Sequence, residues 1–229
     1  MRILALILAR GGSKRLPGKN IMLLGSKPLI AWSIDVVKDM QEISDILVST
    51  DDHNIAKVSK ECGAYVPWLR PSELAKDATS SVDSAIHAID WYEKVNGLID
   101  GVLLLQPTSP FRVKYTVERG IKLFKENADK AVVGVSLASI QPSRMLRICE
   151  SHMVPYFSKN QFEDVFQDLP AYFINGSFYL TSPDYLRSQR SFGGDGFIPL
   201  VIESPFEGID IDTAWDFELA QAILQNKKD

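Results

Sequence analysis

Short apolar runs alternate with segments of helical periodicity along the chain. Four runs are long enough for strands buried on both faces: Ile3 to Leu8, Ile46 to Val48, Gly101 to Leu105 and Ala131 to Val135. A further run at 178–180 resumes the strand pattern. Strands that alternate with helices predict a parallel sheet joined by right-handed crossovers. We therefore expect an α/β fold, with a Rossmann-like, mostly parallel sheet flanked by helices.

Two segments have the spacing of amphipathic helices. In the first, one face is formed by Val82, Ala85, Ile86 and Ile89. Ser80 and Asp83 are spaced as a capping box at its start. The second helix is expected over 213–225, and its pattern predicts a buried face made of Trp215, Leu219, Ala222 and Ile223.

The regular alternation breaks down between Leu137 and Ile174, where polar, aromatic and proline residues are mixed. A chain of 229 residues suits one substantial domain, so we interpret 1–229 as a single domain with 137–174 as a protruding arm. The arm carries more apolar residues than an excursion usually leaves in water: Val154, Tyr156, Phe157, Phe162, Val165 and Phe166. This composition predicts that a second copy of the chain covers the arm.

Composition and charge narrow the class of protein. Charged residues make up 24% and the formal net charge is -4, which argues against a general nucleic-acid binder. Cys62 and Cys149 lie far apart and match no metal-ligand spacing, so we expect reduced thiols in a cytoplasmic protein. The apolar start of the chain is too short to span a bilayer, which predicts no membrane partner.

The strongest local signal is the segment from Arg10 to Asn20, directly after the first predicted strand. It holds four cations and three glycines, which suit a loop that brings backbone N–H groups and positive charge to a phosphate. Its spacing fits neither a P-loop, because five residues separate Gly12 from Gly18, nor a Gly-x-Gly-x-x-Gly fingerprint. The alternative interpretation is a solvated basic loop whose glycines form turns.

This segment resembles the signature of the CMP-sialic acid synthetase family, a branch of the nucleotide-diphospho-sugar transferases. Further stretches resemble family motifs in the same order and cover nearly the whole chain: 70–75, 79–82, 105–110, 175–179 and 210–213. The resemblance implies an enzyme that joins CTP to an acidic nine-carbon sugar and releases pyrophosphate. It also implies a homodimer with exchanged arms and a requirement for Mg²⁺.

The resemblance assigns residues to the nucleotide. The triphosphate would be held by Arg10, Gly11, Ser13, Lys14 and Lys19, with Asn20 near the ribose. Arg70 and Ser81 would surround the cytosine. For Ser81 a helix cap is an equally good interpretation.

Asp210 and Asp212 flank Ile211, so on a strand both carboxylates would project to one face. Carboxylate oxygens suit Mg²⁺, which completes its shell with phosphate oxygens and water. The alternative is a helix N-terminus, with Asp212 as the cap and Thr213 with Asp216 as a capping box.

Uncharged polar side chains are implied for the sugar site: Gln106, Asn175 and Tyr179. Taken alone, Asn175 followed by Gly176 is typical of a turn, and Tyr179 of a core aromatic. Arg144 resembles a basic family position that helps to bind the sugar acid, although a solvated arm residue is an alternative. Phe166 stands where family members that act on sialic acid tend to have arginine, which favours a less hydroxylated sugar such as legionaminic acid.

The hypothesis that follows is in-line attack by the sugar hydroxyl on the α-phosphate of CTP. Arg10, Lys19, Asp210 and Asp212 are the catalytic candidates, and no strong general base or covalent nucleophile stands out. Two alternatives remain within the enzyme class, activation of pseudaminic acid or of Kdo. Kdo-activating relatives carry an acidic residue where this chain has the Gln106 loop, which disfavours Kdo. Outside the enzyme class, the alternative is a CTP-binding regulatory protein without chemistry.

Overall fold

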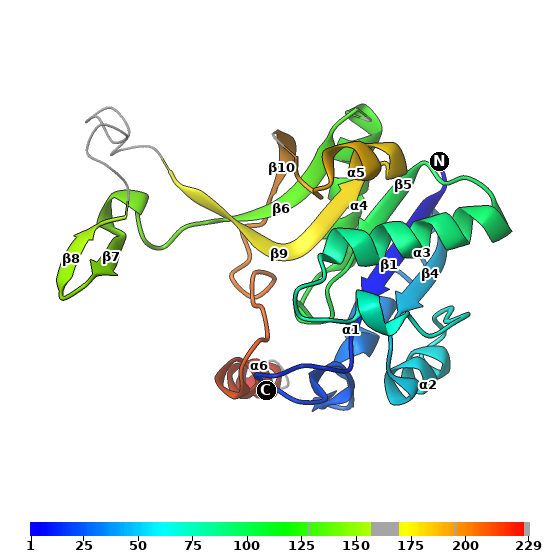
Figure 1. Cartoon of the computed structure of the whole chain (residues 1–229), viewed down its shortest axis with the longest axis horizontal. Helices are drawn as coiled ribbons and strands as arrows, with labels where there is room; N and C mark the ends of the chain where they lie inside the picture. The colour runs from blue at the N-terminus through cyan, green and yellow to red at the C-terminus, as the bar shows by residue number, and fades with distance from the viewer. Residues whose placement is uncertain (128, 157–169, 195, 227–229) are drawn as a thin grey trace.

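The computed structural model describes residues 1–127, 129–156, 170–194 and 196–226. At its centre is a six-stranded sheet with the order β10-β6-β9-β5-β1-β4. These strands are β1 (Ile3–Leu8), β4 (Ile43–Ser49), β5 (Gly101–Leu104), β6 (Ala131–Leu137), β9 (Tyr172–Thr181) and β10 (Phe197–Val201). Within this sheet, β9 runs antiparallel to its neighbours, β5 and β6, whereas the other described pairs of the sheet are parallel. The predicted mostly parallel α/β sheet is confirmed (Figure 1).

Helices flank both faces of this sheet, whereas α6 (Ala214–Asn226) lies apart from it (Figure 1). The other helices are α1 (Leu29–Asp35), α2 (His53–Glu61), α3 (Ser81–Asn96), α4 (Lys114–Glu126) and α5 (Pro183–Gln189). Short elements connect them: the 3₁₀ turns η1 (Lys19–Ile21), η2 (Ser72–Leu74) and η3 (Pro142–Arg144), and the strand pairs β2 (Leu23–Leu24) with β3 (Lys27–Pro28) and β7 (Leu146–Cys149) with β8 (His152–Pro155).

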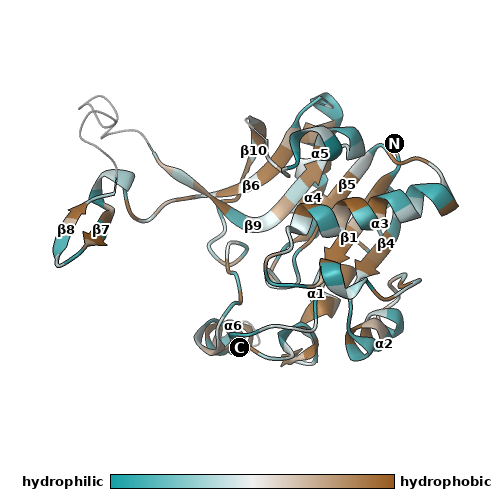
Figure 2. Ribbon diagram, viewed as in Figure 1, coloured by the Kyte–Doolittle hydropathy of each residue, from teal (hydrophilic) through white to brown (hydrophobic). Residues whose placement is uncertain are grey.

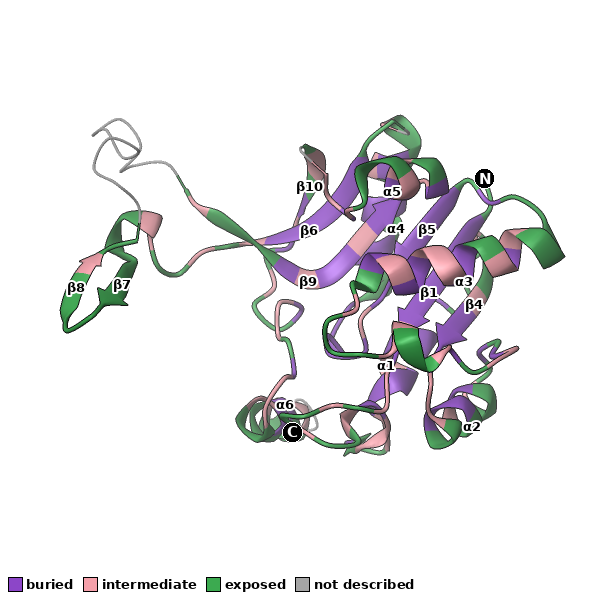
Figure 3. Ribbon diagram, in the orientation of Figure 1, coloured by how far each residue is buried: buried purple, intermediate pink, exposed green. Residues whose placement is uncertain are grey.

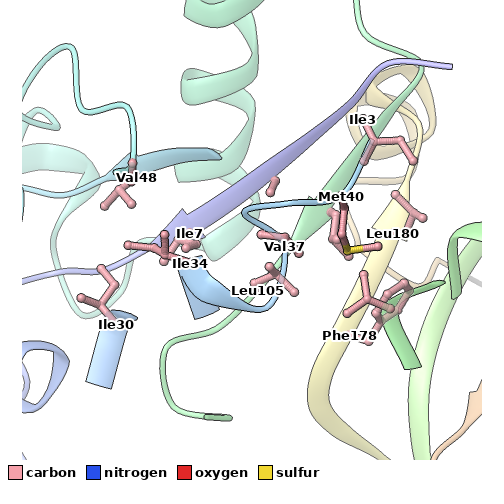
Figure 4. Packing of buried hydrophobic residues seen from close by; sticks show 14 of the residues in the cluster. Ile3, Ile7, Ile30, Ile34, Val37, Met40, Val48, Leu105, Phe178 and Leu180 are labelled. Atoms are coloured by element: carbon pink, nitrogen blue, oxygen red, sulfur yellow. The ribbon is translucent and has the colours of Figure 1, made fainter. Parts of the chain in front are cut away.

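Strand β1 shows how the apolar runs build a core on both sides of the sheet. Ile3, Ala5 and Ile7 face one layer, where Figure 4 shows Ile7 among side chains of α1 and β4. Leu4 and Leu6 alternate with them and join a second layer under α3 and α5. Successive side chains of a strand point to opposite faces, so a continuous apolar run is what a central strand requires.

The long strand β9 is held against α4 by a close approach. Gly120 of α4 lies directly over Phe178, whose ring occupies the space that a Cβ at Gly120 would take. Phe178 and Leu180 join the same core layer as Ile3 and Met40 (Figure 4). This contact fixes the end of β9 that lies in the central sheet.

Beyond the central sheet, β6 and β9 continue as a pair into a protruding arm (Figure 1). Val135 pairs with Ile174 and Leu137 with Tyr172 at the root, and the β7–β8 hairpin forms the far part. The arm exposes a series of apolar side chains: Leu137, Ile140, Met145, Leu146, Ile148, Met153, Tyr172, Phe173 and Ile174. Figures 2 and 3 show the contrast between the buried apolar sheet and this exposed hairpin.

Two details of the predicted helices are wrong. In α6 the buried residues are Phe217 and Ala220, whereas Trp215 is 72% exposed, Leu219 and Ala222 are exposed too, and Ile223 is only partly buried. The sequence pattern has apolar residues on both sides of this helix, and the side that packs is the one facing Leu24 and Leu29. At the start of α3, Ser80 accepts a hydrogen bond from the backbone N–H of Val82, but Asp83 accepts one from Arg190, which follows the last residue of α5.

Within the described residues, no helix combines the length and apolar character that crossing a bilayer demands.

Candidate active site

A cleft of about 460 Å³ opens beyond the carboxyl ends of β1 and β5, where ligands of open α/β sheets bind. Its lining residues come from four regions of the chain: 8–20, Ser81, 104–108 and 210–212. A smaller pocket of about 260 Å³ adjoins it and shares Leu8, Arg10 and Ser81. The two volumes therefore form one site with two lobes.

The loop after β1 is held in place through its backbone. The N–H of Gly11 donates to the Asp51 carboxylate at 3.0 Å, and a Cβ at Gly11 would stand only 3.0 Å from Asp52. Gly18 has a left-handed φ of 69° and begins η1, which turns Lys19 and Asn20 inward. Asn20 is buried, and its side-chain amide donates to the carbonyl of Arg10. Asn20 thus ties the two ends of the loop together.

Two carboxylates hold the four cations of the loop. Asp77 pairs with Lys14 and, at 2.7 Å, with Arg10. The hydrogen bonds from Lys14 and Arg10 hold the pKa of Asp77 below its usual range. At the other end, Asp212 accepts from Lys19 at 2.8 Å and from Arg15 at 2.6 Å. Partial burial would raise the pKa of Asp212, but these two cations bring it below its usual value.

The segment that carries Asp210 and Asp212 is not a strand, contrary to the geometry considered from the sequence. Ile211 is fully buried and donates its N–H to the carbonyl of Thr108, so the two aspartates line the cleft on either side of it. Asp210 is exposed as a residue, yet surrounding protein partly desolvates its carboxyl and raises its pKa, and the charge of Asp212 raises it further. A carboxylate pair with this character attracts a cation.

The start of α6 resolves the alternative role of Asp212. Asp216 accepts hydrogen bonds from the N–H groups of Asp212 and Thr213, and Thr213 caps in return. The Thr213–Asp216 capping box is present, so the helix needs no cap from the Asp212 side chain, which faces the loop cations instead.

The smaller lobe is formed around Arg70. Its side chain is buried, its Nη2 lies 3.8 Å from Asp51, and its Nε has no hydrogen-bond partner among the described residues. Burial lowers the pKa of this guanidinium, but it keeps its proton at neutral pH. Ser81 opens onto both lobes, and Ser80 caps α3 in its place. The cap interpretation of Ser81 is therefore wrong, and its hydroxyl is left at the site.

The residues expected at the sugar are dispersed. Gln106 lines the cleft. Asn175 is buried, where its amide donates to Ser136 and its oxygen accepts from Ser177. Tyr179 packs beside Phe192, and burial together with the charge of Asp210 raises its pKa.

Two further expected sugar contacts belong to the arm. Arg144 is exposed in η3, away from the residues that line the cleft. Phe166 lies outside the described residues. Among the described residues that line the cleft, Arg144 is therefore absent.

The structure also adds residues that the sequence interpretation missed. Asp51 and Asp77 hold the loop, and Arg15 pairs with Asp212. Arg112 is buried beneath the cleft and donates to the carbonyl of Gln106. An isolated charged residue has no spacing pattern that would mark it in the sequence. These residues could have been found only from their position near a strand end or near a motif that resembles the family.

The cytidylyltransferase family model matches residues 4–161. This chain belongs to the cytidylyltransferase family. The match includes the loop after β1, Arg70, Ser81 and the Gln106 segment, which all meet at the cleft. The family resemblance read from the sequence is thereby confirmed, and the enzyme is a nucleotidyltransferase.

Comparison with individual proteins shows which members of the family this cytidylyltransferase is similar to. It is 39% identical to the CMP-N,N'-diacetyllegionaminic acid synthase of Legionella pneumophila, over 98% of this chain and 97% of that protein. It is 31% identical to a pseudaminic acid cytidylyltransferase of Campylobacter jejuni, over 98% and 97%. A solved CMP:2-keto-3-deoxy-manno-octonic acid synthetase in complex with CTP has the same fold, with a TM-score of 0.74, 18% identity and coverage of 99% and 100%.

The cationic loop predicts binding of polyphosphate without any other part of a substrate. Lys19→Ala should weaken the affinity for inorganic tripolyphosphate about tenfold or more, because a hydrogen bond from a charged donor is lost. Isothermal titration calorimetry measures this directly. Lys94→Ala, an exposed lysine on α3, is the matched control and should leave the affinity unchanged. Equal affinities for both variants would contradict a phosphate role for the loop.

Proposed function

We propose that this enzyme joins CTP to an acidic nine-carbon sugar of the nonulosonic acid class, giving the CMP-sugar and pyrophosphate. The observation that carries the proposal is the arrangement of one cleft, in which a cationic loop faces the Asp210–Asp212 pair and adjoins the lobe around Arg70. Two relatives are named for legionaminic acid and pseudaminic acid, and these names support a nonulosonic acid as the acceptor.

The nucleotide fits the two lobes by charge and by size. The triphosphate would lie along Arg10, Gly11, Ser13, Lys14 and Lys19, with Asn20 beside the ribose. The base would enter the smaller lobe, where Arg70 offers an unpaired buried N–H and Ser81 a hydroxyl. In the free protein, Arg10 and Lys14 pair with Asp77, and Lys19 pairs with Asp212. On binding, the phosphates of CTP would take the place of these carboxylates as partners of the three cations.

The chemistry follows from this placement. The anomeric hydroxyl of the sugar attacks the α-phosphate in line, a bond forms from that oxygen to phosphorus, and the bond to the leaving pyrophosphate breaks. The hydroxyl proton passes to surrounding water. Arg10 and Lys19 neutralise the charge that grows on the pyrophosphate, so catalysis comes from positioning and electrostatics, with no covalent intermediate.

We propose Mg²⁺ as the cofactor, held by Asp210 and Asp212. Among the described residues no group of three or more histidine, cysteine or acidic side chains forms a metal cage. Mg²⁺ is commonly bound by one or two carboxylates together with substrate phosphates, so a carboxylate pair beside the phosphate loop fits this ion. When bound, the metal would polarise phosphate oxygens and stabilise the pyrophosphate.

The arms complete the proposal. We infer a homodimer in which each arm lies against the neighbouring copy, since the exposed apolar side chains of 137–156 and 172–174 need cover. Arg144, Phe166 and the arm root would then reach the sugar pocket of the partner. We also place the enzyme in the cytoplasm, where both of its free cysteines stay reduced.

An assay of pyrophosphate release with CTP and a panel of sugar acids tests the function. The catalytic efficiency should be higher for a legionaminic acid than for N-acetylneuraminic acid, and Phe166→Arg should narrow the gap. Phe166 supplies apolar surface where an arginine would offer donors, and such a pocket rejects an extra hydroxyl by about a hundredfold at most. A preference for pseudaminic acid or Kdo would revise the acceptor. Binding of CTP without turnover of any sugar acid would instead support the alternative, a CTP-binding regulatory protein.

The metal assignment predicts a specific loss. Asp212→Asn should fold normally and reduce turnover by orders of magnitude at low Mg²⁺, because the site loses one of its two carboxylates. Turnover is measured as a function of Mg²⁺, with circular dichroism as the test of folding. The matched control is Asp184→Asn on the surface of α5, whose side chain is 97% exposed. Wild-type turnover of Asp212→Asn in metal-limited buffer would refute the assignment.

The dimer proposal predicts that charge on the arm separates the subunits. Ile148 on β7 is 75% exposed, and Ile148→Asp should shift the protein to monomers and lower activity, because a charge would be buried at the contact. Light scattering over a dilution series measures the molar mass of the protein in solution. Leu98→Asp, at a 78% exposed position far from the arm, is the control and should stay dimeric. A fully active wild-type monomer would overturn the proposal.

A further inference from the structure

Arg112 is a buried cation that forms no ion pair within the described residues. Its guanidinium lies just beneath the floor of the cleft. Burial lowers its pKa to about 9, while Asp210 and Glu207 act against that shift, so it carries its charge at neutral pH. A buried charge without an ion pair is costly, and it persists only where hydrogen bonds hold it.

Within the described residues, the hydrogen bonds of Arg112 go to neutral groups on α1, on β9 and in the loop after β5. Its Nη2 donates to the carbonyl of Gln106 at 2.6 Å, its Nη1 to the hydroxyl of Ser33 on α1 at 2.9 Å, and its Nε to the carbonyl of Ser177 on β9. Ser33 in turn donates to the same Gln106 carbonyl at 3.2 Å. Gln106 is therefore fixed through its backbone while its side chain stays at the cleft.

The network continues from Ser177 toward the root of the arm. The N–H and hydroxyl of Ser177 donate to the Asn175 side-chain oxygen, and the Asn175 amide donates to Ser136 on β6. Gly176, between these residues, has a left-handed φ of 79°, and a Cβ there would lie 3.7 Å from the Gln106 side-chain oxygen. One buried chain of polar contacts thus joins the cleft floor to the β6–β9 pair.

We propose that Arg112 is a positioning residue for the acceptor sugar, acting through Gln106 and the Asn175–Ser177 turn. The inference rests on the proposed function and on the expectation from the sequence that Gln106 contacts the acceptor sugar. Within the described residues, the hydrogen bonds of Arg112 go to Gln106, Ser33 and Ser177 and not to the cationic loop, so we expect its influence to fall on the sugar rather than on the nucleotide. The rival interpretation is a packing role, which would lower stability and affect both substrates alike.

Ser33→Ala is the mild test, because it removes the acceptor of Nη1 and one donor to Gln106 without altering volume much. Ser59→Ala is the matched control, since Ser59 is equally buried in a helix and donates within α2, away from the cleft. The kcat/KM for the sugar acid should fall about tenfold in Ser33→Ala, with the KM for CTP within about twofold of wild type. Arg112→Met should lose more, and Arg112→Lys should recover part of that loss.

A second readout separates this inference from the proposed function. If the wild-type protein makes no CMP-sugar, the proposed function is refuted. The effect of the Arg112 hydrogen bonds on Gln106 is measured independently, from the NMR signals of the Gln106 side-chain amide. These signals should shift in Ser33→Ala and Arg112→Lys and stay in place in Ser59→Ala. Unchanged Gln106 signals, or equal losses for CTP and the sugar acid, would overturn the positioning role.

Discussion

Repulsion among the cations of one short loop is the constraint on which the site depends. Arg10, Lys14, Arg15 and Lys19 occupy a stretch shorter than three turns of helix, and like charges this close destabilise any compact arrangement unless anions lie between them. The fold brings those anions from distant segments. Asp77 comes from the connection before α3, and Asp212 from the segment before α6. Closing the loop is therefore coupled to correct docking of the segment before α3 and the segment before α6.

This coupling explains why the segment before α6 is built as it is. Ile211 is buried in the core, and its N–H donates to the carbonyl of Thr108. Asp216 accepts the N–H of Thr213 at the start of α6, so the Asp212 carboxylate is free to pair with the cations of the loop. Burial raises the pKa of the neighbouring Asp210, and the negative charge of Asp212 raises it further. One end of the loop is thus balanced in the free protein, while the carboxylate pair keeps its attraction for a cation.

The sequence predicts the parts of this molecule that repeat or cluster. The buried strands and the cationic loop were predictable, because an unbroken apolar run and a glycine-rich basic segment each have few other uses. The buried face of α6 was not, since both sides carry apolar residues and only the partner surface of Leu24 and Leu29 decides between them. Asp77 and Arg112 were missed because their importance comes from tertiary contacts alone. Asn175 was expected at the ligand, yet its hydrogen bonds are made within the protein.

The shared strands of sheet and arm set a rule for how this enzyme can diverge. β6 and β9 pair in the core and again in the arm, with a register shift between Val133 and Val135, so the register of the arm is set by its own root pairs, Val135 with Ile174 and Leu137 with Tyr172. Beyond that shift, an insertion of one residue in either strand would turn every following side chain to the opposite face. Two residues added to both strands would lengthen the arm and keep its faces. Evolution can therefore change the reach of the arm in paired steps, while the nucleotide cleft keeps its shape.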